Sequence, residues 1–116
     1  MSGRVKRVYD EPTKSDGRRV LVDHLWPRGL KKNDAQLHEW LREIAPSTML
    51  RKSFGHDPSG WKEFKKKYWA ELDDRRGEVE KLARDARRRS VTLLFGARDT
   101  KHNNAVALKE YIEQLK

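Results

Sequence analysis

Two short apolar runs in this chain have the pattern of buried β-strands. The first occupies residues 20–25 and is bounded by the sequence Trp-Pro-Arg-Gly. The second occupies residues 90–95 and is followed by Gly96. Continuous apolar runs of this length favour strands that are covered on both faces. A weakly alternating segment at residues 4–9 predicts a third, shorter strand, and the turn-forming residues 10–19 predict a loop.

Most of the remaining apolar residues recur at helical spacing, which predicts several amphipathic helices. Asn33 can cap a helix that continues to Ile44, and Ser47 can cap a second that ends at Gly55. Asp57 followed by Pro58 is a typical helix start, and Gly77 interrupts the pattern that follows. The inward positions are Leu37, Trp40, Leu41 and Ile44; Leu50 and Phe54; Trp61, Phe64, Tyr68 and Leu72; Val79, Leu82, Ala83 and Ala86; and Leu108, Tyr111, Ile112 and Leu115.

The order of these elements predicts an α/β fold. We expect one three-layer-like domain over residues 1–116, with a short, mostly parallel sheet of about three strands and four to five helices. The two apolar strands are joined through helices, so they should run parallel. The loop at residues 10–19 is close to the shortest parallel crossover, so the first strand can run in either direction.

Composition narrows the chemistry that the chain can perform. The absence of cysteine excludes disulfides, thiolate nucleophiles and cysteine-based zinc sites. The sequence has no apolar run long enough for a membrane span, and its first residues lack the apolar region of a secretory signal. We therefore expect a cytoplasmic protein without a membrane partner. The net charge of +9 favours anionic partners, although basic helices that are merely solvated give the same total.

Polar residues gather just beyond the two apolar strands. In parallel sheets, ligands bind beyond the carboxyl ends of the strands, so we expect these two loops to form one rim. Carboxylates and an imidazole there can transfer protons, and guanidinium groups can hold a phosphate or carboxylate. The candidate catalytic residues are Asp23, Asp99 and His102, and the candidate substrate-binding residues are Arg28, Arg98 and Asn103.

The same rim residues also have structural interpretations. Asp23 beside Arg98, or Arg28 beside Asp99, can form ion pairs that only fix the loops, and Asn103 can serve as a helix cap. The helical spacing of Asp99 and His102 suits a metal, but further ligands are missing, so we predict no metal site. At His56 and Asp57, a capping role for Asp57 is favoured over a functional one.

The segment at residues 61–69 combines lysines with aromatic rings, as single-stranded nucleic-acid binders do. Its rings recur at helical spacing, however. We therefore expect Trp61, Phe64 and Tyr68 to be core residues, with the lysines on the solvent side.

Four segments together resemble the YeaO-like family of small bacterial proteins. They lie at residues 20–29, 45–48, 54–58 and 97–103, and the runs Leu-Trp-Pro-Arg-Gly and Phe-Gly-His-Asp-Pro are specific. The resemblance covers nearly the whole chain and implies a compact α/β domain in which both strand-end motifs lie together. The family is one of unknown function. The family pattern more often has arginine at the position of His24.

Longer relatives in the wider superfamily carry Cys-His-Arg near the position of His102 and Asn103. This chain has no cysteine there, so a thiol mechanism cannot be carried over.

We therefore interpret the chain as an enzyme or ligand-binding domain for an anionic, phosphate- or carboxylate-bearing small molecule. The alternative is a nucleic-acid-binding protein that uses its basic helices. No P-loop, nucleophile elbow or dinucleotide fingerprint specifies a reaction or a cofactor. The sequence does not specify an oligomeric state.

Overall fold

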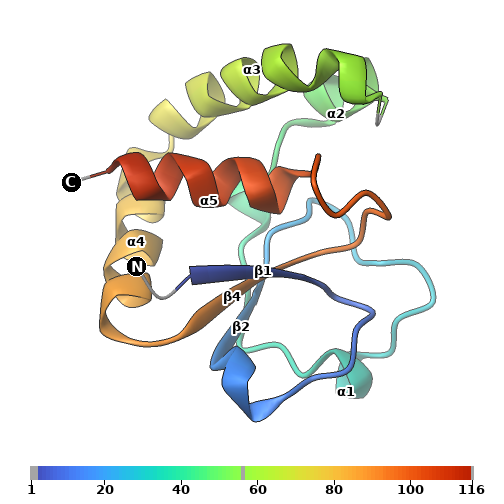
Figure 1. Ribbon diagram of the computed structural model, residues 1–116, viewed down its shortest axis with the longest axis vertical. Coiled ribbons are helices and arrows are strands. Elements are labelled where there is room, and N and C mark those ends of the chain that lie inside the picture. Colours follow the sequence, from blue (N-terminus) through green and yellow to red (C-terminus); the bar gives the residue numbers. More distant parts are fainter. Residues whose placement is uncertain (1–2, 56, 116) are drawn as a thin grey trace.

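The last strand of the chain lies inside a four-stranded parallel sheet with the order β1-β4-β2-β3 (Figure 1). The computed structural model describes residues 3–55 and 57–115. Each residue of β4 pairs with β1, and its first four also pair with β2. The predicted parallel arrangement is confirmed, and β1 runs in the same direction. The strands are β1 (Gly3–Arg7), β2 (Arg18–Leu21), β3 (Glu39–Trp40) and β4 (Val91–Phe95).

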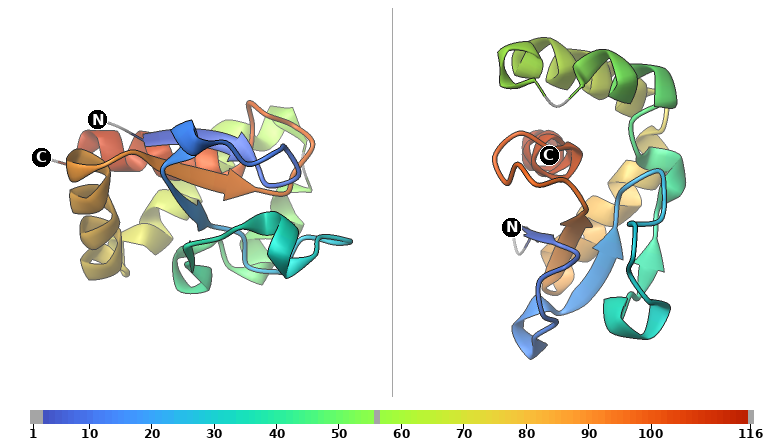
Figure 2. Two further views of the ribbon diagram at one scale, coloured as in Figure 1. Left: turned by 90° about the horizontal axis from the view of Figure 1, so that it is seen from below. Right: turned by 90° about the vertical axis from the view of Figure 1, so that its right-hand side faces the viewer.

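Five α-helices accompany the sheet, which confirms the α/β class. Helix α5 lies between α3 and the sheet and contacts β1 and β4 (Figures 1 and 2). The helices are α1 (Lys32–Ala35), α2 (Thr48–Phe54), α3 (Trp61–Asp73), α4 (Arg76–Arg88) and α5 (Asn104–Gln114), with single 3₁₀ turns at Lys14–Asp16, Arg42–Ile44 and Pro58–Gly60. Within residues 3–55 and 57–115, no helix is both long and apolar enough to cross a membrane.

The alternation of side chains along the strands divides the core into two clusters. Val91, Leu93 and Phe95 of β4 pack with apolar residues of α2 to α5 in the larger cluster. Leu94 belongs to the smaller cluster, which is covered by side chains of the connecting segments. Helices therefore cover one face of the sheet, and mostly loops cover the other. The smaller cluster contains Val8, Leu21 and Leu94, with Trp26, Leu30, Leu37 and Trp40 packed against it.

The predicted helix from Asn33 to Ile44 is wrong. Helix α1 has only four residues and ends at Gln36, whose φ of 47° is in the left-handed region. Residues 39 and 40 then pair with β2 as the additional strand β3. Trp40 packs on the smaller cluster, whereas Ile44 lies in the larger one. The helical spacing of these residues thus arises from burial in two different cores.

Helix α2 begins and ends as predicted. Ser47 Oγ accepts a hydrogen bond from the N–H of Leu50, and Gly55 ends the helix with a φ of 55°. The next predicted helix start is shifted, because Asp57 caps the 3₁₀ turn that precedes α3. The interruption between α3 and α4 falls at residues 74–75, and Gly77 lies inside α4.

The aromatic residues of α3 are core residues, as predicted. Phe64 and Tyr68 are buried and Trp61 is half-buried, while Lys62 and Lys66 are exposed. Lys65 differs from the expectation because it is half-buried. Its ammonium is 2.9 Å from a Glu110 carboxylate oxygen and lies between the rings of Trp61 and Trp69.

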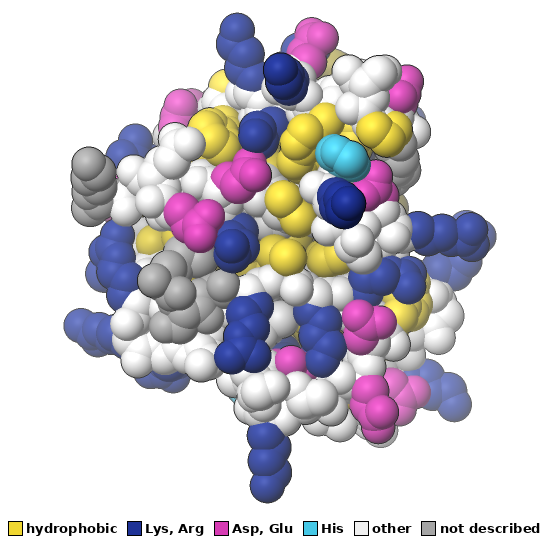
Figure 3. All heavy atoms as spheres, viewed as in Figure 1, with side chains coloured by type: hydrophobic (Ala, Val, Ile, Leu, Met, Phe, Trp, Pro, Cys, Tyr) yellow, Lys and Arg dark blue, Asp and Glu magenta, His cyan; other side chains and the backbone are white. Residues whose placement is uncertain are grey.

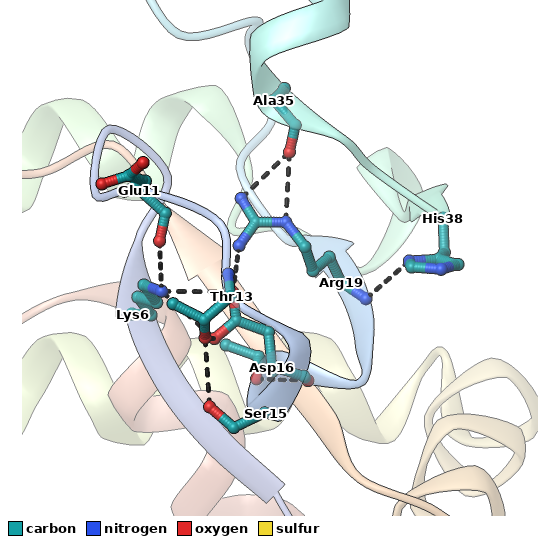
Figure 4. A network of polar contacts seen from close by, with 9 residues as sticks. Lys6, Glu11, Thr13, Ser15, Asp16, Arg19, Ala35 and His38 are labelled. Atoms are coloured by element: carbon teal, nitrogen blue, oxygen red, sulfur yellow. Dashed lines mark hydrogen bonds and ion pairs between the residues drawn. The ribbon is translucent and has the colours of Figure 1, made fainter.

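A buried ion pair joins the β1–β2 connection to β2. The Arg19 guanidinium donates to a carboxylate oxygen of Asp16, and its Nε and Nη2 donate to the Ala35 carbonyl at 3.1 and 2.9 Å (Figure 4). Both charged residues are buried. The ammonium of Lys6 lies 3.1 Å from both Asp16 carboxylate oxygens. A charge that would be costly to bury alone is therefore fully paired.

Burial alone raises the pKa of Asp16. Hydrogen bonds from the Thr13 backbone N–H, Lys6, the Thr13 hydroxyl and Arg19 outweigh this effect and hold the pKa well below its ordinary range. The carboxylate thus remains ionised wherever the fold is intact near neutral pH.

The same connection is attached to the start of β4. The Thr92 hydroxyl donates to the Asp16 carbonyl at 2.7 Å, and the Arg18 N–H donates to the Ser90 carbonyl at 2.9 Å. Between these contacts, Gly17 has a φ of 63°, and a Cβ there would lie 2.4 Å from the Ser90 oxygen. A side chain at residue 17 would collide with the backbone of Ser90, so the close contact between these two segments requires glycine.

We predict that Asp16→Asn lowers the free energy of unfolding by about 3 kcal/mol at pH 7, because Arg19 would stay buried without its counter-charge. The exposed Asp10→Asn is the matched control and should change stability little. Urea unfolding measures both. Because the folded pKa of Asp16 is depressed, its contribution is present above about pH 4 and is lost on acidification. An unchanged acid profile in Asp16→Asn would contradict this account.

Candidate functional site

A pocket of about 540 Å³ opens beyond the carboxyl ends of β2 and β4. The segment after β2, with Tyr9 of the β1–β2 connection bonded to it, forms one wall, residues of α2 and α3 form another, and the loop from β4 to α5 completes the lining. This is the position where ligands bind in parallel sheets. The lining residues are Tyr9, Asp23, His24, Leu25, Trp26, Pro27, Arg28, Pro46, Arg51, Lys52, Phe54, Phe64, Gly96, Ala97, Asn103 and Asn104.

Asp23 joins three segments of the pocket lining. One carboxylate oxygen accepts a hydrogen bond from the Gly96 N–H at 2.8 Å, and the other accepts from the Asn104 side-chain amide at 3.1 Å. The same amide donates to the Val22 carbonyl at 2.8 Å. Asp23 therefore connects the end of β2 to the end of β4 and to the start of α5.

The close approach of Asp23 to the chain is eased by the glycine at residue 96. A Cβ on Gly96 would lie 3.0 Å from the Asp23 carboxylate, and within 4 Å of Pro27 and the Tyr9 ring. The carboxylate would then have to shift by a few tenths of an ångström. Glycine therefore lets Asp23 keep its short hydrogen bond to the backbone N–H without that shift.

The wall after β2 has aromatic rings that are held in place. The Tyr9 hydroxyl donates to the Arg28 carbonyl at 2.8 Å, and the Arg7 guanidinium lies 5.0 Å from the centre of the Tyr9 ring. The Trp26 indole N–H donates to the Leu30 carbonyl at 2.8 Å. Tyr9 is 41% exposed and Leu25 is 57% exposed, so the lining includes exposed apolar side chains.

The wall formed by α2 and α3 combines stacked rings with cations. The rings of Phe54 and Phe64 stack with centroids 4.5 Å apart. Arg51 lies three residues before Phe54 in α2, so both side chains lie on one helix face. Among the described residues, Arg51 Nε is buried and has no hydrogen-bond partner. This wall was not predicted from the sequence, because the placement of Arg51 beside the pocket depends on where α2 packs.

In the loop after β4, the side chain of Asp99 is hydrogen-bonded to other groups of the same loop. One carboxylate oxygen of Asp99 accepts hydrogen bonds from the N–H groups of Lys101 and His102, at 2.9 and 3.0 Å, and the other lies 2.9 Å from His102 Nδ1. The Lys101 N–H and then the His102 ring hold the pKa of Asp99 below its ordinary value. The rings of His102 and Trp61 form a T-shaped contact, with centroids 5.4 Å apart.

Asn103 caps helix α5. Its side-chain oxygen accepts from the Val106 N–H at 3.0 Å, and its amide donates to the Asp99 carbonyl at 2.9 Å. The side chain is buried. The capping alternative considered from the sequence is thus the one seen in the contacts of Asn103.

The six residues proposed from the sequence fall into two groups. Three line the pocket and three lie outside its lining, with Arg98 exposed to solvent. His56 lies outside the described residues. In the part of the chain that the structure describes, no three acidic or histidine side chains gather closely enough to hold a metal ion. The pocket-lining group is Asp23, Arg28 and Asn103; the other group is Arg98, Asp99 and His102.

Cations predominate in the described part of the lining. Asp23 is its acidic residue, and it accepts hydrogen bonds from Gly96 and Asn104. A neighbouring cavity of about 650 Å³ between the 42–44 turn and α3 has both signs of charge. The first pocket is therefore the better candidate for an anion. Its basic residues are Arg28, Arg51 and Lys52.

The chain is similar to bacterial proteins along nearly its whole length. A family model described as "Inactive DUF488-N3 subclade" matches residues 3–116. "Uncharacterized protein YeaO" of Escherichia coli (strain K12) is 44% identical over 115 residues, which cover 99% of this chain and 100% of that protein. "Uncharacterized protein Rv3073c" of Mycobacterium tuberculosis (strain ATCC 25618 / H37Rv) is 36% identical over 109 residues, or 94% and 92% of the two chains. No solved structure matches significantly.

We predict that Asp23→Ala lowers the free energy of unfolding by about 2 kcal/mol, because it removes the acceptor of the Gly96 N–H and leaves the Asn104 amide with only the Val22 carbonyl. In a double-mutant cycle with Asn104→Ala, the two effects should fall short of additivity by about 1 kcal/mol. Urea unfolding of the two single variants and the double variant measures this coupling. Strictly additive effects would show that the two side chains act independently.

Proposed function

Because this chain belongs to the YeaO-like proteins of the inactive DUF488-N3 subclade, we propose that it is a non-catalytic domain that binds a small anionic molecule. The binding site is the pocket at the carboxyl ends of β2 and β4.

The observation that carries this proposal is the cationic lining of the pocket, to which Arg51, Arg28 and Lys52 contribute. Among the described residues, the buried Nε of Arg51 has no hydrogen-bond partner, so no counter-charge holds the guanidinium through that atom. The terminal nitrogens of Arg51 can donate to an anionic ligand group in the pocket, and Arg28 and Lys52 add to the positive field. The single negative charge of Asp23 is smaller than the positive charge of the three basic side chains in the lining, so the pocket remains electropositive.

The contacts of the rim residues support binding rather than catalysis. Asp99 and His102 bond to each other and to the backbone of their own loop, and neither lines the pocket. Asn103 is used as a helix cap. Asp23 holds the Gly96 N–H and the Asn104 amide. The word "inactive" in the description of the matching subclade agrees with this reading.

The dimensions of the pocket also suit a small molecule. Its volume of about 540 Å³ is within the range of ligand pockets, which is roughly 300–1,000 Å³. Such pockets combine apolar walls with a few polar groups that orient the ligand. The walls formed by Trp26, Phe54 and Phe64, with Arg51 among them, have this composition.

The basic surface favours nucleic acid less. Lys and Arg side chains are spread over the face in Figure 3 and are interspersed with acidic ones, whereas nucleic-acid binders gather cations in one stripe. On α3, Phe64 and Tyr68 are buried and cannot stack on bases. Lys62, Lys66 and Lys67 are exposed on this helix, so binding of DNA has to be measured as well.

We expect pyrophosphate at low salt to shift the NMR signals of the Gly96 and Asn104 amides and of the Trp26 indole. Arg51→Gln should weaken this binding at least about tenfold, because a charge-assisted hydrogen bond contributes about 1.5–3 kcal/mol. Arg84→Gln is the matched control, since Arg84 is exposed on α4 outside the pocket. It should leave the affinity nearly unchanged.

Two results would contradict the proposal. One is an equal loss of affinity in Arg51→Gln and Arg84→Gln, which would show only general charge attraction. The other is tight, salt-dependent binding of a DNA duplex that survives Arg51→Gln and fails when Lys65, Lys66 and Lys67 are replaced. That second result would favour the nucleic-acid alternative.

A further inference from the structure

We propose that the ligand of this pocket is a flat aromatic ring system that carries a carboxylate or phosphate group. This inference rests on the proposed function and adds the shape of the ligand to its charge. It follows from the kind of apolar surface in the pocket, from the rigidity of that surface and from the position of Arg51.

The apolar surface consists mainly of rings. Tyr9, from the β1–β2 connection, and Trp26 supply the more accessible rings, whereas Phe54 and Phe64 on the helical wall are largely buried and add little exposed surface. Aromatic side chains bind other rings through stacked and edge-to-face contacts that aliphatic groups cannot make. The lining therefore favours a flat aromatic ligand over an aliphatic one of equal size.

These rings are already in place without a ligand. Tyr9 is held by its hydrogen bond to the Arg28 carbonyl and by Arg7 against its ring, and Trp26 is held by the Leu30 carbonyl and by its edge-to-face contact with Trp40. A ring that enters the pocket does not have to order its partners first, which lowers the entropic cost of binding.

The cation and the aromatic rings can act on one ligand. Arg51 and Phe54 are three positions apart in α2 and line the same pocket as Tyr9 and Trp26, so a charge on the ligand can meet the guanidinium while its ring meets the aromatic part of the lining. An acid attached directly to an aromatic ring, or a phosphate attached to a nucleoside, has both parts.

Binding of three matched compounds to the full chain, followed by the Trp26 indole NMR signal, tests this inference. The compounds are 2-naphthoate, its saturated decahydro analogue and the neutral 2-naphthamide. We expect 2-naphthoate to bind about three- to tenfold more tightly than the saturated acid, because only the flat ring gains aromatic contacts. It should also bind at least about tenfold more tightly than the amide, which lacks the charge for Arg51.

Variants of Tyr9 separate ring contacts from general apolar contact. Tyr9→Leu should remove most of the preference for 2-naphthoate over the saturated acid, and Tyr9→Phe, which keeps the ring, should retain it. Circular dichroism checks that both variants are folded. A comparison of the affinities for AMP and ribose 5-phosphate then tests whether a nucleotide can supply the ring. Tighter binding of AMP would favour a nucleotide, and equal binding of the two would favour an aromatic acid.

The outcomes separate this inference from the proposed function. If both acids bind equally and both depend on Arg51, the anion site stands and the aromatic inference is overturned. If 2-naphthamide binds as tightly as 2-naphthoate and Arg51→Gln has no effect, the proposed anion binding fails. If none of the compounds, AMP included, perturbs the Trp26 signal, the aromatic inference is overturned, and the proposed anion site is overturned with it only if pyrophosphate also fails to bind.

Discussion

The fold depends on one constraint, which is that β4 must be inserted between two strands that precede it by some seventy residues or more. All five residues of β4 are buried, and the strand supplies the backbone partners of both β1 and β2. Before β4 is in place, β1 and β2 are not hydrogen-bonded to each other. The chain must therefore close long loops before most of its sheet exists, which makes folding slow relative to helical proteins of this size.

The candidate site is a consequence of the same constraint. When β4 lies beside β2, the ends of the two strands meet, and Gly96 comes within hydrogen-bond distance of Asp23. Asn104 then fixes the start of α5 to the same carboxylate. The pocket lining is thus assembled from segments that are far apart in the sequence. Its walls belong to different layers, since Trp26 packs on the smaller cluster and Phe54 belongs to the larger one.

Those parts of the fold whose burial is complete could be predicted from the sequence. Residues 20–22 and 91–95 are apolar except for the buried Thr92 because both faces of each strand are covered, and short runs of this kind that end at glycine or proline favour strands. The two-residue strand β3 could not be predicted, because so short a segment has no periodicity of its own. Leu37, Trp40 of β3 itself and Ile44 have helical spacing because they pack in two different clusters.

The candidate site could be predicted only where it follows the strands. Asp23 and Arg28 come directly after a buried strand, and the topology brings both to the pocket. Arg51 could not be assigned in this way, because its burial depends on where α2 packs and not on its neighbours in the sequence. The role of Asp99 could not be predicted from its residue type. One of its carboxylate oxygens accepts hydrogen bonds from the N–H groups of Lys101 and His102, which a sequence does not reveal.

The edges of the sheet have a consequence for how copies of this chain meet. An exposed strand edge is a template for pairing with another molecule, and proteins commonly protect it with charge or by shortening it. Here the outer strand β1 carries Arg4, Lys6 and Arg7 among its five residues, and the opposite outer strand β3 is two residues long. A second molecule that added a strand to β1 would bring like charges together, and at β3 it would gain few hydrogen bonds. Both edges therefore resist edge-to-edge aggregation, even though the sheet between them is apolar.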